Sequence, residues 1–201
     1  MALYVTLVDF KDEYKDIVGS ADDAFINRAL NAAQTALDTF LRRVVYANSD
    51  TTKYFDSTGD SVDGLDLYVM DKGDLCSITT VTNGDATTVT SGQYTTYPKT
   101  LTELSPTYQR LRLLPSSGIS WTYSTDSENA VSIAGKWGMW ATAATVPDAF
   151  KVSVMELAAH SMESRKSQVF DTVAIPDAGV ITVPTGFPAT VRARLAPWRR
   201  L

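Results

Sequence analysis

Apolar side chains recur every three or four residues at the start of the chain, which is the period of an α-helix. Leu7, Phe10 and Tyr14 share one face, and Thr6 is placed to cap the first turn. In the following stretch, AFINRALNAAQTALDTFLRRVV, apolar residues again recur at spacings of three and four. The pattern predicts a short helix followed by a long amphipathic helix, whose apolar face must pack against another element.

After Tyr46 the period of the apolar residues changes to two, and threonine, serine and glycine become frequent, which is typical of short β-strands. Asn83 and Gly84 form a strong hairpin motif between two of these stretches. The predicted strands are TTKYFD, LDLYVM, LCSITTV and residues 87–90, 93–97, 108–114, 119–123 and 130–137. So many short strands at close spacing predict a small β-barrel or β-sandwich over residues 48–145.

The helical period returns at Pro147, which suits the first turn of a helix because its missing N–H has no partner there. Phe150 and Val154 then begin an apolar stripe. Because neither this helix nor the N-terminal one can leave its apolar face in water, we expect the two to pair. The predicted fold is therefore α+β, with a helical bundle built from residues 1–47 and 146–170 and an inserted β domain.

The stretch IAGKWGMW joins the β domain to the returning helix. We expect Trp137 and Trp140 to fill the seam between the two modules, while Gly135 and Gly138 permit a tight bend of the backbone. With Pro147, these residues make up the predicted module junction. A site where the indole rings stack on a ligand is the alternative interpretation.

Residues 171–201 contain half of the prolines of the chain and show no helical period. Such a segment predicts an extended C-terminal tail that becomes ordered on a partner surface, and the alternative is that it packs back on its own domain. The charge is divided unevenly. Residues 172–201 carry a net charge of +3, so the remainder carries −8 of the total of −5.

An acidic body does not grip duplex DNA, because that mode of binding needs clustered lysine and arginine to neutralise phosphates. The same charge could still line a passage through which DNA slides.

No apolar run approaches the roughly 20 residues that cross a bilayer. Residues 1–10 also lack the cationic start and cleavage site of a signal peptide. We therefore expect a soluble protein that is made in the cytoplasm and has no membrane partner.

Cys76 and His160 are the only cysteine and the only histidine, which leaves almost no catalytic machinery and excludes a multi-cysteine metal site. We expect a buried strand position for the cysteine and a helical position for the histidine. One loop contains several carboxylates: Asp56, Asp60, Asp63 and Asp66. Their spacing does not fit a calcium-binding loop, so a solvated hairpin loop is expected. Nucleotide-binding and hydrolase motifs do not occur, and we expect neither enzymatic activity, nor a metal, nor a cofactor.

A series of stretches carries a resemblance to a known family: YVTLVDFKDEYKDI, INRALNAAQTALDTFLRR, TTKYFD, LYVMDKGDLCSITTVTNGD, and IAGKWGMW followed by VPDAFKVSVMELAAH. In this order they resemble the head-tail connector (adaptor or head completion) proteins of tailed bacteriophages over residues 3–170. The resemblance implies a homo-oligomeric ring of about twelve copies below the portal, which prolongs the DNA channel and connects the capsid to the tail. The implied location is the neck of the virion, after synthesis in the host cytoplasm.

The same resemblance implies the partners. They are the portal protein, a stopper or tail-completion protein, and double-stranded DNA that passes without specific binding. In that family the C-terminal segment docks on the portal. By this resemblance the candidate docking residues are Arg192, Arg194, Trp198, Arg199 and Arg200, with the tryptophan as apolar anchor and the arginines as partners of portal carboxylates. Truncation after Pro188 should then abolish docking and leave the body folded.

Two other functions stay open at this point. The chain could be a different neck component, such as a stopper or tail-completion protein. Alternatively, a β module rich in tyrosine and tryptophan could bind a carbohydrate or a receptor. That function would leave the rings of Trp121, Trp137 and Trp140 exposed for stacking on sugars.

Overall fold

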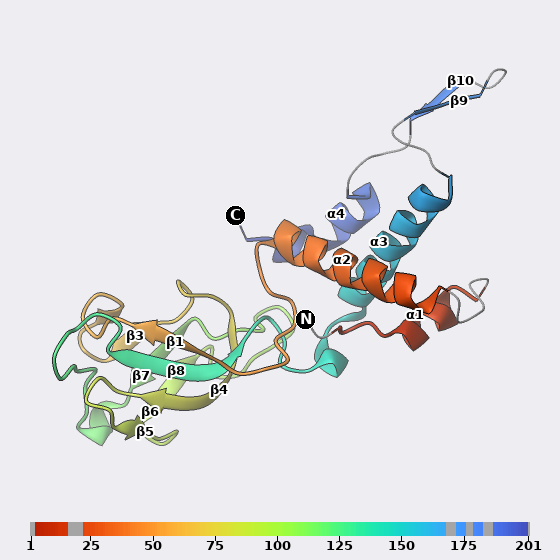
Figure 1. Cartoon of the computed structure of the whole chain (residues 1–201). Coiled ribbons are helices and arrows are strands. Elements are labelled where there is room, and N and C mark those ends of the chain that lie inside the picture. Colours follow the sequence, from red (N-terminus) through yellow and green to blue (C-terminus); the bar gives the residue numbers. More distant parts are fainter. Residues whose placement is uncertain (1–2, 16–21, 168–171, 176–178, 183–186, 201) are drawn as a thin grey trace. The chain divides into compact units, whose positions relative to one another are not determined.

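The computed structural model describes residues 3–15, 22–167, 172–175, 179–182 and 187–200. The chain forms two compact units: a helical unit, Met1–Arg42 with Val146–Leu201, and a β unit, Arg43–Thr145. Figure 1 follows the chain through the elements of both units. The fold is α+β, with the β unit inserted into the helical one, as predicted.

The β unit begins at Arg43, slightly before the predicted boundary at residue 48. The Arg43 guanidinium donates to both carboxylate oxygens of Asp74, at 2.7 and 2.8 Å. The Met139 N–H also donates to the carbonyl of Val44 at 2.8 Å. These bonds attach the segment after the long helix to the sheets, so it folds with the β unit.

The first two helices follow from local sequence signals. α1 (Leu7–Glu13) begins with a capping box, in which Thr6 Oγ1 accepts from the Asp9 N–H at 3.1 Å and the Asp9 carboxylate accepts from the Thr6 N–H at 2.8 Å. The Thr6 N–H and the Thr6 hydroxyl, which donates at 2.7 Å, both bind the Asp9 carboxylate and hold the pKa of Asp9 below its usual value. α2 (Asp23–Leu41) ends at Arg42, whose left-handed φ of 56° closes the helix before the predicted end near Val44.

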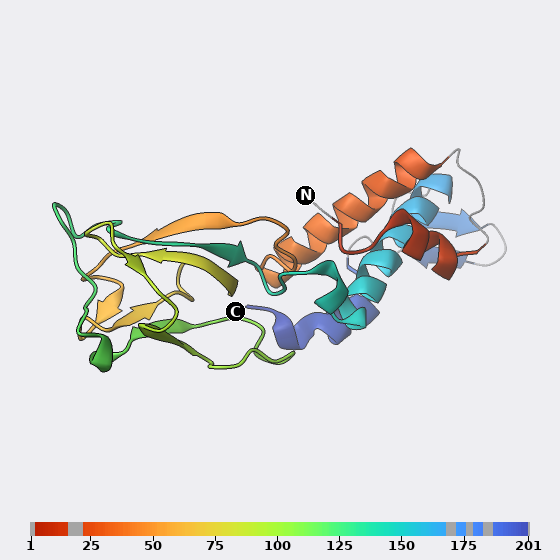
Figure 2. The same ribbon diagram turned by 90° about the horizontal axis from the view of Figure 1, so that it is seen from below.

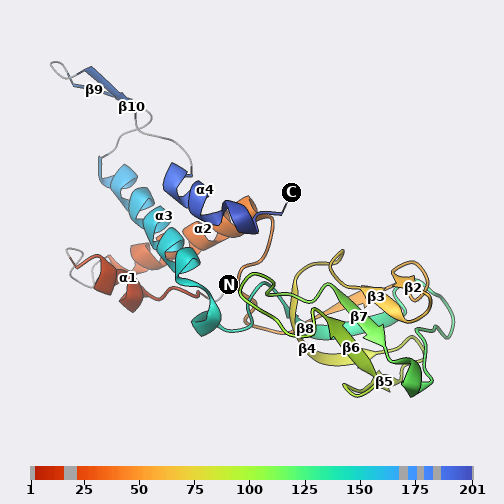
Figure 3. The ribbon, with the colours of Figure 1, turned by 180° about the vertical axis from the view of Figure 1, so that it is seen from behind.

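The helices of this unit share one apolar core. α3 (Asp148–Ser167) follows Pro147, whose carbonyl accepts from the Phe150 N–H at 3.0 Å, so the proline lies at the helix start as predicted. α2 packs against α3, α1 against α2, and α4 (Ala189–Leu195) against α3 (Figure 3). The buried apolar residues include Phe10 of α1, Ile26, Leu30, Leu37 and Leu41 of α2, Phe150, Val154 and Ala158 of α3, and Val191 and Leu195 of α4. The first and last parts of the chain thus pair as expected.

The β unit is a sandwich of two four-stranded antiparallel sheets, shown as two layers in Figure 2. The sheet orders are β1-β8-β4-β5 and β2-β3-β7-β6. The strands are β1 (Thr51–Phe55), β2 (Ser61–Val62), β3 (Asp66–Tyr68), β4 (Leu75–Thr82), β5 (Thr88–Val89), β6 (Tyr94–Tyr97), β7 (Arg110–Leu113) and β8 (Val131–Trp137). Short 3-10 turns occur at Pro115–Ser117 and Ala143–Thr145. Both sheets contribute to one core, which contains Phe55, Leu67, Leu75, Val81, Leu111, Leu113 and Ile133.

Residues 119–123 form a loop instead of the predicted strand. The alternation of apolar residues misled the prediction, because Trp121 enters the core from this loop and its indole N–H donates to the Leu65 carbonyl at 2.8 Å. Asn83 of the hairpin motif helps to hold the loop, since its Nδ2 donates to the Ser120 carbonyl at 2.9 Å. A side chain predicted only as a turn former therefore also connects two loops.

Two positions of the module junction require glycine because the backbone is closely packed there, and one of them also lies in a bend. A Cβ on Gly135, inside β8, would lie 2.1 Å from the Ser77 carbonyl oxygen of β4, where the register of the two strands shifts. A Cβ on Gly138, in the bend after β8, would lie 2.9 Å from the Ala47 nitrogen. Gly138 thus serves the predicted bend, whereas Gly135 serves strand packing.

Gly135→Ala should destabilise the β unit by about 3 kcal/mol, because the added methyl group must displace a backbone carbonyl. Gly92→Ala is the matched control, since nothing lies within 4 Å of the Cβ that it would introduce. Urea unfolding followed by tryptophan fluorescence measures both free energies of unfolding. Equal stability of the two variants would contradict the close approach of β4 and β8.

The C-terminal segment is folded in part, which corrects the prediction of an extended tail over residues 171–201. β9 (Thr172–Ile175) pairs with β10 (Gly179–Thr182) as an antiparallel hairpin, and α4 is followed by the 3-10 turn Ala196–Trp198. Two of the four prolines that suggested an extended chain, Pro188 and Pro197, lie at the starts of helical segments, where proline is tolerated. Residues 168–171, 176–178, 183–186 and 201 of the predicted bundle and tail lie outside the described residues.

Candidate docking surface at the C-terminal segment

α4 is held on the helical unit by apolar and polar contacts. Val191 and Leu195 are fully buried. Arg194 donates to the Glu156 carboxylate at 3.1 Å and to Ser153 Oγ at 3.0 Å, both on α3. For α4, the alternative prediction is therefore confirmed: this part of the tail packs on its own domain.

The 3-10 turn after α4 is attached to the same unit. The ring of Trp198 meets the ring of Phe150 edge-on, with 5.2 Å between the ring centroids. The Arg200 N–H donates to the carbonyl of Leu41 at 3.0 Å. Trp198, predicted as the anchor for a partner, thus packs against its own helical unit.

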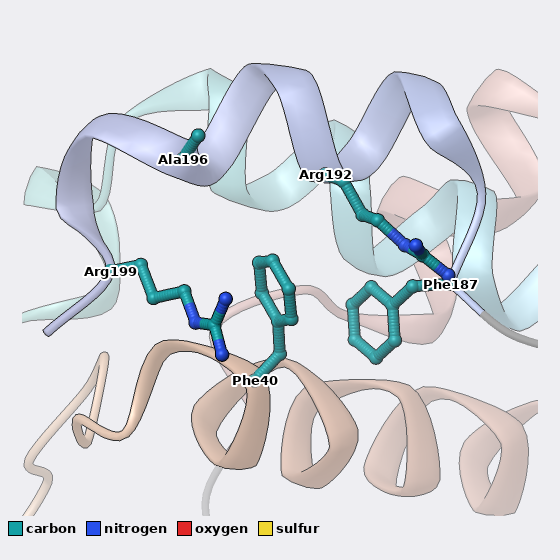
Figure 4. A pocket seen from close by; sticks show the side chains of 5 residues that line it. All are labelled: Phe40, Phe187, Arg192, Ala196 and Arg199. Carbon is teal, nitrogen blue, oxygen red and sulfur yellow. The ribbon is translucent and has the colours of Figure 1, made fainter. Parts of the chain in front are cut away.

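An open groove lies between α2 and the C-terminal segment. We call it the aromatic groove. It has a volume of about 520 Å³ and is lined by Phe40, Phe187, Arg192, Ala196 and Arg199. Figure 4 shows the two phenyl rings side by side, with Arg192 beside one ring and Arg199 beside the other. The rings stack with 4.8 Å between centroids and 21° between planes, and the Arg199 guanidinium lies 5.1 Å from the centroid of Phe40.

The groove combines an apolar floor with positive charge. Arg192 and Arg199 are exposed, and neither takes part in an ion pair within the described part of the chain. Guanidinium groups bind carboxylates in a planar, two-bond geometry and also stack on aromatic rings. The arrangement therefore suits a protein segment that places an apolar side chain between carboxylates.

The structure separates the predicted docking residues into two groups. Arg192 and Arg199 line the aromatic groove, and Arg200 is exposed next to it in the chain. Arg194 and Trp198 face their own helical unit. Phe40 was not predicted as a groove residue, because a phenylalanine on the apolar stripe of a long helix is expected in the core.

The three tryptophans of the β unit do not form a stacking platform. Trp121, Trp137 and Trp140 are buried, contrary to what a carbohydrate-binding module requires. The indole N–H of Trp137 donates to the carbonyl of Thr51 at 2.9 Å, and its ring stacks with Phe55 at 6.0 Å. Trp121 and Trp137 belong to the core of the sandwich, and a role for Trp137 and Trp140 at a seam between modules stays a prediction.

The residues considered for catalysis or metal binding do not come together in one site of the described structure. Cys76 is buried in β4, and burial raises the pKa of its thiol to about 11, so the thiolate is scarce at neutral pH. His160 lies on α3. Asp66, predicted in a solvated loop, instead begins β3, where it is buried and pairs with Arg110 and Arg112. Within the described residues, no group of three or more carboxylates, cysteines or histidines is placed to hold a metal ion.

None of the described helices combines the length and the apolar character needed to cross a membrane.

No protein-family model matches the chain, and no curated protein matches it. Two solved structures are similar along almost the whole length. A chain from the neck of an empty gene transfer agent (GTA) particle, computed with C6 symmetry, covers 100% of this chain and 93% of its own, at 16% identity and a TM-score of 0.58.

The second chain comes from the neck of the native GTA particle, computed with C12 symmetry. It covers 98% of this chain and 93% of its own, with 17% identity and a TM-score of 0.52. The likeness covers the helical unit, the inserted β unit and the C-terminal segment together. The protein shares the fold of these neck chains.

Proposed function

We propose that this protein is a structural neck protein of a phage or phage-like virion, a head-tail adaptor that forms a ring of about twelve copies below the portal. The observation that carries the proposal is the fold, shared from end to end with chains of particle necks, one of them computed with C12 symmetry. The ordered motifs of the sequence support the same family. In this role the protein works without enzymatic activity, cofactor or membrane, after synthesis in the host cytoplasm.

The aromatic groove supports docking on the portal. Arg192 and Arg199 offer two guanidinium groups on either side of the stacked rings of Phe40 and Phe187. A portal segment with carboxylates around an apolar side chain would neutralise both charges and cover the rings. Arg200 adds a positive charge next to the aromatic groove. Arg194 and Trp198 contribute indirectly, because they hold α4 and the turn after it on the helical unit.

The charge of the β unit suits a channel through which DNA passes. Residues 43–145 carry eleven aspartates and glutamates against seven lysines and arginines, a net charge of −4. Fixed negative charge repels phosphates, and so it opposes the retention of DNA that must move. This balance supports the passage of DNA without specific binding.

The native mass of the complex formed with portal rings from the same genome tests the proposal. An adaptor should add about twelve copies of the chain as one discrete species. A stopper or tail-completion protein should ignore bare portal rings and bind only after an adaptor is present. A chain that stays monomeric with portal rings would contradict the adaptor role.

A further inference from the structure

The outer face of one sheet carries a fixed cluster of tyrosine and arginine. In the sheet β2-β3-β7-β6, the register places Tyr97, Arg110 and Tyr68 in one row across the strands. The Arg110 guanidinium lies 4.1 Å from the ring centroid of Tyr97 and 6.0 Å from that of Tyr68. The neighbouring row places Arg112 opposite Asp66. We call these residues, with Met70 at the margin, the tyrosine-arginine face.

Asp66 fixes both arginines of this face. One of its carboxylate oxygens accepts from Arg112 at 2.8 Å and from Arg110 at 3.2 Å. The other oxygen, Oδ1, is buried and accepts no hydrogen bond from the described residues, which is costly unless a donor from outside reaches it. Two guanidiniums over one carboxylate leave the face with a net charge of +1.

The composition of the face is that of a protein-protein contact. Tyrosine, arginine and methionine are enriched in interfaces and tyrosine and arginine in their hot spots. Tyr97 is 41% exposed and Met70 is 39% exposed, although both are large and mostly apolar. Because Asp66 and the tyrosines already hold Arg110 in place, little side-chain entropy is lost when a partner covers it.

A surface of opposite character lies at one end of the same unit, formed by the loops 83–87 and 118–130. The Asn83 side chain joins them, and neither loop contains lysine or arginine. Three exposed carboxylates lie in these loops: Asp85, Asp126 and Glu128. Hydrogen bonds from the Thr87 hydroxyl and N–H hold the pKa of Asp85 below its usual value, so it stays charged. Tyr123, 49% exposed, lies among them, and we call this surface the acidic end.

We propose that the tyrosine-arginine face of one copy binds the acidic end of the next copy in the ring. The inference rests on the proposed ring function. A closed ring requires a heterologous contact, in which each copy offers two different surfaces. The two surfaces share no residue. The Ser57 N–H donates to the Ser127 carbonyl at 2.9 Å, which holds the loop 118–130 beside the end of β1, a strand of the other sheet of the sandwich, so one copy can use both surfaces at once. Opposite charge and an exposed tyrosine on each side make them complementary.

Cysteine cross-linking of the assembled ring tests this contact. Met70→Cys marks the face and Ser124→Cys marks the acidic end, while the buried Cys76 reacts too slowly to interfere. With a short bismaleimide, the double variant should give a ladder of covalent multimers on a denaturing gel. A mixture of the two single variants should give dimers at most, and each single variant alone should give none.

A charge reversal supplies the second measurement. Asp126→Lys with Glu128→Lys should raise the concentration at which the ring dissociates at least tenfold, as read from sedimentation velocity. Asp12→Lys with Glu103→Lys makes the same change of net charge at exposed positions outside both surfaces, and should leave that concentration unchanged.

The outcomes separate this contact from the adaptor role. A ring that forms but gives no ladder, or that tolerates the reversal at the acidic end as well as the control, overturns the contact and leaves the adaptor role intact. A chain that forms no ring, alone or on portal rings, overturns both.

Discussion

Reversing the charges of Arg192 and Arg199 together, by Arg192→Glu with Arg199→Glu, should abolish binding to portal rings. Both guanidiniums flank the stacked rings of Phe40 and Phe187 and are exposed, so a partner carboxylate can reach them. A glutamate at either position would repel the carboxylate of the portal that the arginine is proposed to bind. Disrupting one close charge pair in an interface costs about 2–5 kcal/mol, so the double reversal should weaken binding about a thousandfold or more.

Native mass spectrometry or sedimentation with portal rings measures this loss. Lys15→Glu with Arg28→Glu is the control, because it changes the net charge equally at exposed positions of the same unit outside the aromatic groove. Circular dichroism should show that both variants keep their helices. Binding by the double reversal at the level of the control would remove the aromatic groove from portal docking.

The parts of the fold that depend on local pattern were predictable from the sequence. The capping box at Thr6, the helical stripe around Leu30 and the start of α3 after Pro147 each involve residues within one or two helical turns. The alternation of period two likewise predicted most strands. Where a residue in a loop entered the core, as Trp121 does, the same alternation indicated a strand that does not form.

The aromatic groove could not be predicted, because its parts lie far apart in the sequence. Phe40 belongs to α2 and Phe187 precedes α4, and only the packing of the helical unit brings their rings within 4.8 Å. The family resemblance made Arg192 and Arg199 candidates, but it gave the same status to Arg194. The ion pair with Glu156, which directs Arg194 onto α3, depends on the tertiary structure.

Removing residues 189–201 should unfold the helical unit, which revises the expectation that the body survives truncation. Val191 and Leu195 are fully buried, and the deletion also removes the ion pair between Arg194 and Glu156. Loss of one buried aliphatic side chain costs about 2–5 kcal/mol, so the two together cost about 5 kcal/mol or more. That is comparable to the whole stability of a small domain.

Urea unfolding followed by far-ultraviolet circular dichroism measures this cost. Deletion of residues 199–201 alone is the control, because Arg199 and Arg200 are exposed and the buried residues of α4 remain. A full truncation as stable as the control would mean that α4 is not part of the core. If the helical unit unfolds as expected, loss of portal binding by the truncated chain says nothing about docking. Only the charge reversal at Arg192 and Arg199, which leaves α4 in place, can then assign the contact.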